Sequence, residues 1–133
     1  MKNTLLLVAW MAVLTWVLIV VASLLRARAW TGTGLQVAFG NRDTLPEPGA
    51  LAGRAERTTR NTLENFVLFA ALALVAHAVQ ADAVAVARGA TLFFWSRLAY
   101  VAVYYLGLAY VRTAIWLIGV VGLGMMVAAI VSR

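Results

Sequence analysis

The stretch TLLLVAWMAVLTWVLIVVASLL, residues 4–25, contains no charged side chain and stops at Arg26. An apolar run of about 20 residues is what a helix needs to cross the hydrocarbon core of a bilayer. A cleaved secretory signal would have a shorter apolar stretch and a small-residue cleavage site, whereas the boundary here reads Arg26-Ala27-Arg28. The stretch therefore predicts a permanent transmembrane helix.

Three further apolar runs follow, and the four together fill most of the chain. Hydrophobic residues make up 64% of the 133 residues and charged residues only 12%, a balance that indicates lipid as the main solvent. The runs extend over about residues 4–25, 57–79, 84–110 and 113–131, with Arg112 between the last two. We expect an all-α membrane protein, a four-transmembrane-helix bundle that forms one domain over residues 1–133.

The longest polar segment covers about residues 26–56. It contains Thr31-Gly32-Thr33-Gly34 and Pro46-Glu47-Pro48-Gly49, which favour turns, so we expect a loop without a fold of its own. Arginines gather in and beside it, namely Arg26, Arg28, Arg42, Arg54, Arg57 and Arg60. The positive-inside rule makes this loop cytoplasmic and places both termini outside the cytoplasm. The compact loops and the lack of an organelle address point to a bacterial inner membrane.

The other two connections are short, so the last three helices should pack as antiparallel neighbours. Gly119, Gly122 and Gly124 in the last run would allow a close approach between helix backbones.

Several functions are excluded by composition. The chain has no cysteine and one histidine, His77, which rules out disulfides, thiolate metal sites and a cysteine nucleophile; we expect no metal site. The net charge of +6 does not indicate a nucleic-acid partner, because the basic residues form no patch with interleaved aromatic residues.

Two of the runs carry stripes of polar side chains, although a charge at mid-helix costs roughly 2.5–3.5 kcal/mol on insertion scales. The first stripe, at i, i+4 and i+7, consists of Arg57, Asn61 and Glu64. The second, at i, i+3 and i+7, consists of Arg97, Tyr100 and Tyr104, with Arg112 after it. Such stripes must face protein or water, and they predict a charged cavity on the cytoplasmic side.

Two interpretations of these stripes stay open. In the first, Glu64 forms an ion pair with Arg97 or Arg60 that only fixes the register of the helices. In the second, the cavity holds an anionic ligand, because Arg57, Arg60, Arg97 and Arg112 outnumber Glu64 by four to one. The imbalance favours the second interpretation.

The sequence resembles the MAPEG family, the membrane-associated proteins in eicosanoid and glutathione metabolism. The resemblance covers essentially the whole chain and rests on Arg57-Thr58-Thr59-Arg60-Asn61-Thr62-Leu63-Glu64-Asn65, Gly40-Asn41-Arg42-Asp43 and Arg97-x-x-Tyr100-x-x-x-Tyr104 followed by Arg112. It implies a homotrimer of four-helix subunits in membrane lipid, with glutathione bound between adjacent subunits near the cytoplasmic face.

The resemblance also implies roles for residues of the first stripe and the first connection. Arg57 and Asn61 would hold the γ-glutamyl end of glutathione, Glu64 its ammonium, and Arg26 the glycyl carboxylate or a neighbouring group.

The second stripe would line the same pocket from the third helix of the next subunit, through Arg97, Tyr100 and Tyr104. The resemblance implies that Arg112 faces the sulfur, and Arg112 and Tyr104 are the expected catalytic residues. A free thiol has a pKa of about 8.5, which a neighbouring cation lowers, so Arg112 would favour the thiolate.

We therefore expect a glutathione S-transferase that conjugates or reduces small hydrophobic electrophiles, lipids among them. The alternative is a non-catalytic binding or scaffold protein of the same family, with a lipid or another anion in the same pocket. A small multidrug exporter also has four spans, but that class depends on a carboxylate in its first span, and residues 4–25 contain none.

Overall fold

The computed structural model describes residues 1–41, 43, 45 and 47–132, and in them the chain forms five helices. They are α1 (Lys2–Ala27), α2 (Gly32–Phe39), α3 (Ala50–Ala78), α4 (Ala83–Leu106) and α5 (Ala109–Val131). No strand occurs among these described residues, so the all-α prediction is confirmed. Arg42 and Pro46 of the first connection lie outside them.

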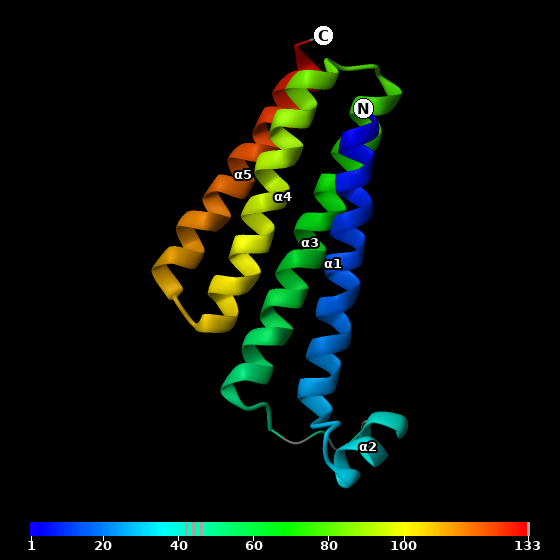
Figure 1. Cartoon of the computed structure of the whole chain (residues 1–133), viewed down its shortest axis with the longest axis vertical. Coiled ribbons are helices and arrows are strands. Elements are labelled where there is room, and N and C mark those ends of the chain that lie inside the picture. The colour runs from blue at the N-terminus through cyan, green and yellow to red at the C-terminus, as the bar shows by residue number, and fades with distance from the viewer. Residues whose placement is uncertain (42, 44, 46, 133) are drawn as a thin grey trace.

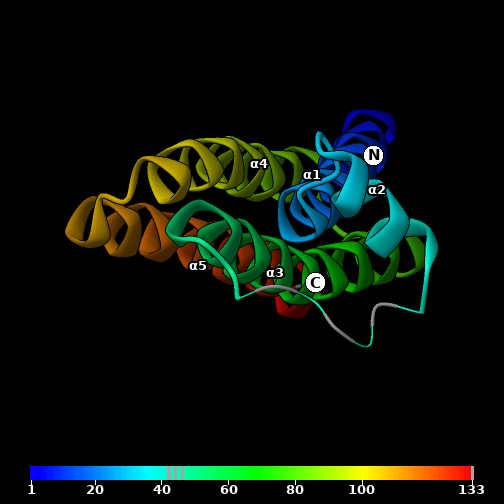
Figure 2. The same ribbon diagram turned by 90° about the horizontal axis from the view of Figure 1, so that it is seen from below.

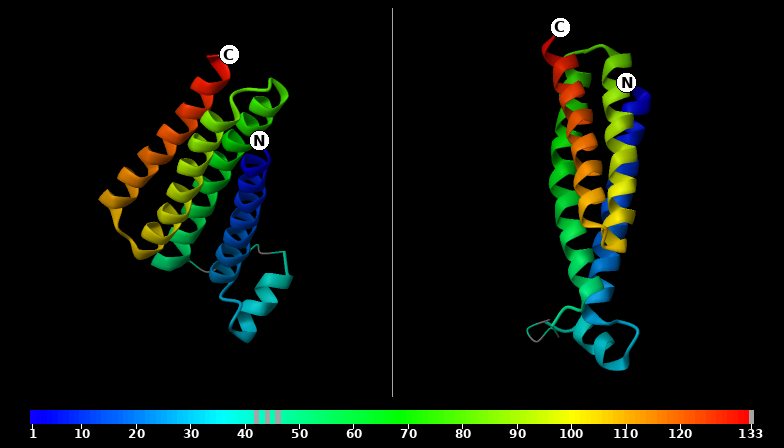
Figure 3. Two further views of the ribbon diagram at one scale, coloured as in Figure 1. Left: turned by 45° about the horizontal axis from the view of Figure 1, so that its top comes forward. Right: turned by 90° about the vertical axis from the view of Figure 1, so that its left-hand side faces the viewer.

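The four long helices lie side by side, with α1 against α3 and α4 against α5 (Figures 1 and 2). Both termini lie at one end of this bundle, which we call the terminus end (Figure 3). The short helix α2 and the turn between α4 and α5 lie at the other end, which we call the loop end (Figure 1).

Three helices are long and apolar enough to cross a membrane. Within the described part of the chain these are α1, α3 and α5. The remaining long helix, α4, carries Arg88 and Arg97 and does not reach the same apolar character.

The first connection differs from its prediction. It was expected to contain turns only, which is wrong for residues 32–39, because α2 forms there. Thr31 stabilises the start of α2, since its Oγ1 accepts a hydrogen bond from the Gly34 amide at 3.0 Å. Helix α3 begins at Ala50, before the expected residue 57, because its first turns are polar but still favour a helix.

The turn between α4 and α5 also lies earlier than expected. Gly107 has a φ of 81°, a left-handed conformation that favours glycine, and it ends α4. Helix α5 then begins at Ala109, so Arg112 lies in its first turn. The sequence had predicted Arg112 in the connection between the last two helices, which is wrong. The apolar run up to Tyr110 concealed this turn, because hydropathy does not register a left-handed glycine.

The core lies between all four long helices. Its centre is a stack of Phe69 on Phe93, with ring centroids 4.6 Å apart, and both side chains are fully buried together with Met11 and Met126. This packing holds α3 against α4, the two helices that carry the polar stripes.

Glycines of α4 and α5 allow these two helices to pack closely. A Cβ on Gly122 would lie 2.8 Å from both the Gly89 carbonyl oxygen and the Phe93 amide nitrogen. A Cβ on Gly119 would lie 2.7 Å from Ser96 Oγ, whereas one on Gly124 would meet nothing within 4 Å. The predicted close approach is confirmed for Gly119 and Gly122 only.

We predict that Gly122→Ala lowers the free energy of unfolding by about 1–3 kcal/mol, because two backbone groups would have to move apart. Unfolding in detergent, followed by circular dichroism, measures this loss. The matched control is Gly124→Ala, which adds the same methyl group where there is space and should cause no loss. An equal loss in the two variants would contradict this account of the contact.

Candidate functional site

The two polar stripes face each other within one chain. The Nε of Arg57 on α3 donates a hydrogen bond to the Tyr104 hydroxyl on α4 at 3.3 Å. The Nη1 of Arg97 on α4 donates to Asn61 Oδ1 on α3 at 3.0 Å. Arg97 and Tyr104 of the second stripe thus contact the α3 of their own chain, and the implied place of this stripe in a pocket shared with the next subunit stays a prediction. The sequence alone could not show this, because stripe spacing does not say which copy of α3 a face meets.

Aromatic rings hold two of the guanidinium groups. The Arg97 guanidinium carbon lies 4.2 Å from the Tyr100 ring centroid, and that of Arg112 lies 4.5 Å from the Tyr104 centroid. The two tyrosine rings meet edge to face, with centroids 5.5 Å apart. Cations over aromatic faces are attracted by the ring quadrupole, so these arginines are held without neutralisation of their charge.

A cavity of about 260 Å³ opens beside these tyrosines, and we call it the tyrosine pocket. Helices α3, α4 and α5 all contribute to its wall, through Asn61, Tyr100, Tyr104, Arg112, Thr113 and Trp116. Among the residues that the structure describes, the wall holds one cation and no acidic side chain. Complete small-molecule sites measure about 300–1,000 Å³, so one chain supplies a small or partial site.

Arg97 lies behind the wall of the tyrosine pocket. Its side chain is only 1% exposed and does not line the cavity, but it contacts Asn61 and Tyr100, which do. Two of its nitrogen atoms, Nε and Nη2, have no hydrogen-bond partner in the described part of the chain. A buried cation without full compensation makes the pocket more favourable for an anion.

Arg26 lies in a different cavity. Its Nε pairs with Glu56 Oε1 at 3.0 Å, and both line a groove of about 500 Å³ between α1 and α3, together with Thr59 and Arg60. The structure thus does not bring Arg26 to the tyrosine pocket.

Glu64 is exposed on the outer surface of α3. Within the described ranges it forms no ion pair with Arg60 or Arg97, so the interpretation in which it only neutralises one of them is not supported within one chain. It is also absent from the walls of the tyrosine pocket and of the Arg26 groove.

Two residues of the tyrosine pocket were missed in the sequence. Thr113 and Trp116 follow Arg112 at i+1 and i+4, so the register of a helix that starts at Ala109 would have indicated Trp116. The ion pair between Glu56 and Arg26 has no recognisable pattern in the sequence, because it joins two different helices.

Comparison with known proteins gives one match. The model of the MAPEG family matches residues 4–132, nearly the whole chain. No match was found among curated proteins or among solved structures.

We predict that Asn61→Ala costs about 1–3 kcal/mol of stability, because it removes the hydrogen-bond acceptor of a buried guanidinium. In an Arg97→Met background the same change should cost little, since no cation is left unpaired. Unfolding of both single variants and the double variant in detergent measures the coupling. Asn65→Ala is the control, because its amide donates a hydrogen bond to the Asn61 backbone carbonyl of its own helix and, among the described residues, to no other group. An equal cost of Asn61→Ala in both backgrounds would show that the pair does not stabilise the bundle.

Proposed function

The chain belongs to the MAPEG family, and we propose that it is a glutathione-dependent transferase that conjugates or reduces small hydrophobic electrophiles dissolved in the membrane. It is an integral membrane protein with three clearly apolar helices, and we propose α4 as the fourth span. The polar face of α4 would then be turned toward α3 and away from lipid, as the burial of Arg97 and Tyr100 favours.

The observation that carries this proposal is the charge around the tyrosine pocket. Arg112 lines it, Arg57 bonds to a tyrosine of its wall, and Arg97 lies directly behind it. No acidic side chain of the described ranges lies in the wall. Glutathione, with two carboxylates and one ammonium, has the charge that fits such surroundings.

Two residues have suitable places for chemistry at sulfur. Bound glutathione would supply the sulfur nucleophile, which a chain without cysteine cannot provide. Arg112 would favour the thiolate over the thiol because a nearby cation stabilises the charged form. The Tyr104 oxygen accepts a hydrogen bond from Arg57, so the hydroxyl keeps its own proton to donate toward the sulfur.

We propose that the site is completed by a second subunit in a homotrimer, as the resemblance implies. Arg57, Arg60 and Glu64 lie exposed on α3, and ionisable groups facing lipid in a span are costly. A neighbouring subunit over this face would cover them and enlarge the partial tyrosine pocket. Glu64 would then be available to the ligand ammonium.

The orientation follows from the same charges. The loop end carries Arg26, Arg28, Arg54 and Arg57, so we propose that it faces the cytoplasm of a bacterial cell. The start of α1 and the end of α5 would then lie on the other side of the inner membrane. The two termini share one end of the bundle, in keeping with this arrangement (Figure 1).

We predict that Arg112→Ala lowers the rate of conjugation with a generic aryl halide by about 10²-fold or more, while glutathione still binds. The ultraviolet absorbance of the thiolate, which should appear when glutathione is added to the purified protein, should be lost in the variant. Lys2→Ala removes one positive charge at the terminus end and serves as the control with unchanged rate and absorbance.

Full activity of Arg112→Ala would remove this residue from the mechanism. Glutathione binding by the unaltered protein with neither thiolate nor turnover would support the alternative, a non-catalytic binding protein.

We predict that Glu64→Gln weakens glutathione binding by about 10–100-fold, because it removes the counter-charge of the ligand ammonium. Calorimetric titration with glutathione and with its desamino analogue tests the contact. The unaltered protein should bind the analogue more weakly by the same factor, and the variant should not distinguish the two ligands. Glu47→Gln, which changes an exposed carboxylate of the connection, is the control. A variant that still prefers glutathione would show that Glu64 does not meet the ammonium.

A further inference from the structure

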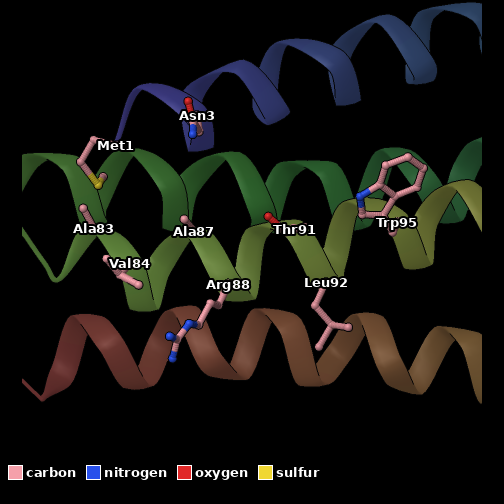
Figure 4. Close-up of a pocket in the computed structure, with 9 residues that line it drawn as sticks. All are labelled: Met1, Asn3, Ala83, Val84, Ala87, Arg88, Thr91, Leu92 and Trp95. Carbon is pink, nitrogen blue, oxygen red and sulfur yellow. The ribbon is translucent and has the colours of Figure 1, made fainter.

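A second groove extends from the terminus end to the middle of α4 (Figure 4). It has a volume of about 730 Å³ and lies between the start of α1 and the first half of α4. We call it the terminus groove. It shares no residue with the tyrosine pocket or with the Arg26 groove.

Small side chains keep the terminus groove open. Ala83, Ala87 and Thr91 follow one another at every fourth residue, and Figure 4 shows them in a row on the side of α4 that faces α1. Trp95 continues this row one turn further and is 63% exposed. From Ala83 to Trp95 the row is roughly 18 Å long at the rise of an α-helix, a length suited to an extended hydrocarbon chain.

Among the described residues that line the groove, Arg88 has the one charged side chain, and it stands at the side of this row. Arg88 is exposed, and it has no hydrogen-bond or ion-pair partner within the ranges that the structure describes. The nearest carboxylate in sequence, that of Asp82, already accepts hydrogen bonds from the Val84 and Ala85 amides at 2.9 and 2.7 Å. Figure 4 shows the Arg88 guanidinium extending past α4 toward α5, beside the apolar wall.

The position of Arg88 near the start of α4 favours an anion of the membrane surface. It lies little more than one turn inside α4, and with α4 as the proposed fourth span its guanidinium would reach the headgroup region and lipid phosphate. The row of small side chains, roughly 18 Å long, suits an acyl chain, and the guanidinium near its outer end suits the phosphate of an anionic lipid.

We propose that the terminus groove binds an anionic phospholipid of the adjacent leaflet, with the phosphate on Arg88 and one acyl chain along Ala87, Thr91 and Trp95. The site is independent of the proposed enzymatic function, since the described residues that line it are not those of the tyrosine pocket. The lipid would fill the space between α1 and α4, which contact each other less than α4 and α5 do.

Native mass spectrometry of the purified protein with phosphatidylglycerol or phosphatidylcholine tests the site. The unaltered protein should retain phosphatidylglycerol in preference, and Arg88→Gln should lower its retention about fivefold without changing that of phosphatidylcholine. Ala87→Leu should displace both lipids while Arg88 is still present, because it narrows the groove. Lys2→Gln, an equal change of charge nearby, is the control, and circular dichroism checks that each variant is folded.

Equal retention of phosphatidylglycerol by the unaltered protein, Arg88→Gln and Ala87→Leu would overturn the proposal. The proposal is also overturned if Ala87→Leu dissociates the subunits and leaves lipid retention unchanged, because the groove would then be covered by a second copy of the chain.

Discussion

The burial of Arg97 is the constraint on which the arrangement of the loop end depends. Its guanidinium is 1% exposed inside a bundle of apolar helices, where a charge is costly unless polar groups surround it. Asn61 accepts one of its hydrogen bonds and the Tyr100 ring lies under the cation. These contacts determine which face of α4 meets α3, and the same face carries Tyr104 to the tyrosine pocket.

The part of the tyrosine pocket that α5 contributes is positioned by backbone geometry. Gly89 and Gly122 bring α4 and α5 so close that no side chain fits between them, and Gly107 turns the chain in a left-handed conformation. Together they place the first turn of α5 beside the end of α4, and the Arg112 guanidinium lies over the Tyr104 ring as a result. The position of this cation thus depends on three glycines outside the pocket.

Much of the fold was predictable because hydropathy and helical spacing are local properties. They identified the long helices and both polar stripes, but not α2, whose short sequence is rich in glycine, nor the Gly107 turn within an apolar run. Contacts between helices could not be predicted in the same way. The spacing could not show that Arg26 belongs to a cavity with Glu56, or that Trp116 joins Tyr104, because such pairings arise only when the helices pack.

Equilibrium binding of glutathione in detergent, compared with that of its diethyl ester, tests the central claim most directly. If guanidinium groups around the tyrosine pocket hold an anionic peptide, glutathione binds saturably, and the ester, which lacks both carboxylate charges, binds at least about 10-fold more weakly. The difference should shrink as salt is added. Equal binding of the two compounds, or no binding of glutathione at millimolar concentration, would contradict the account.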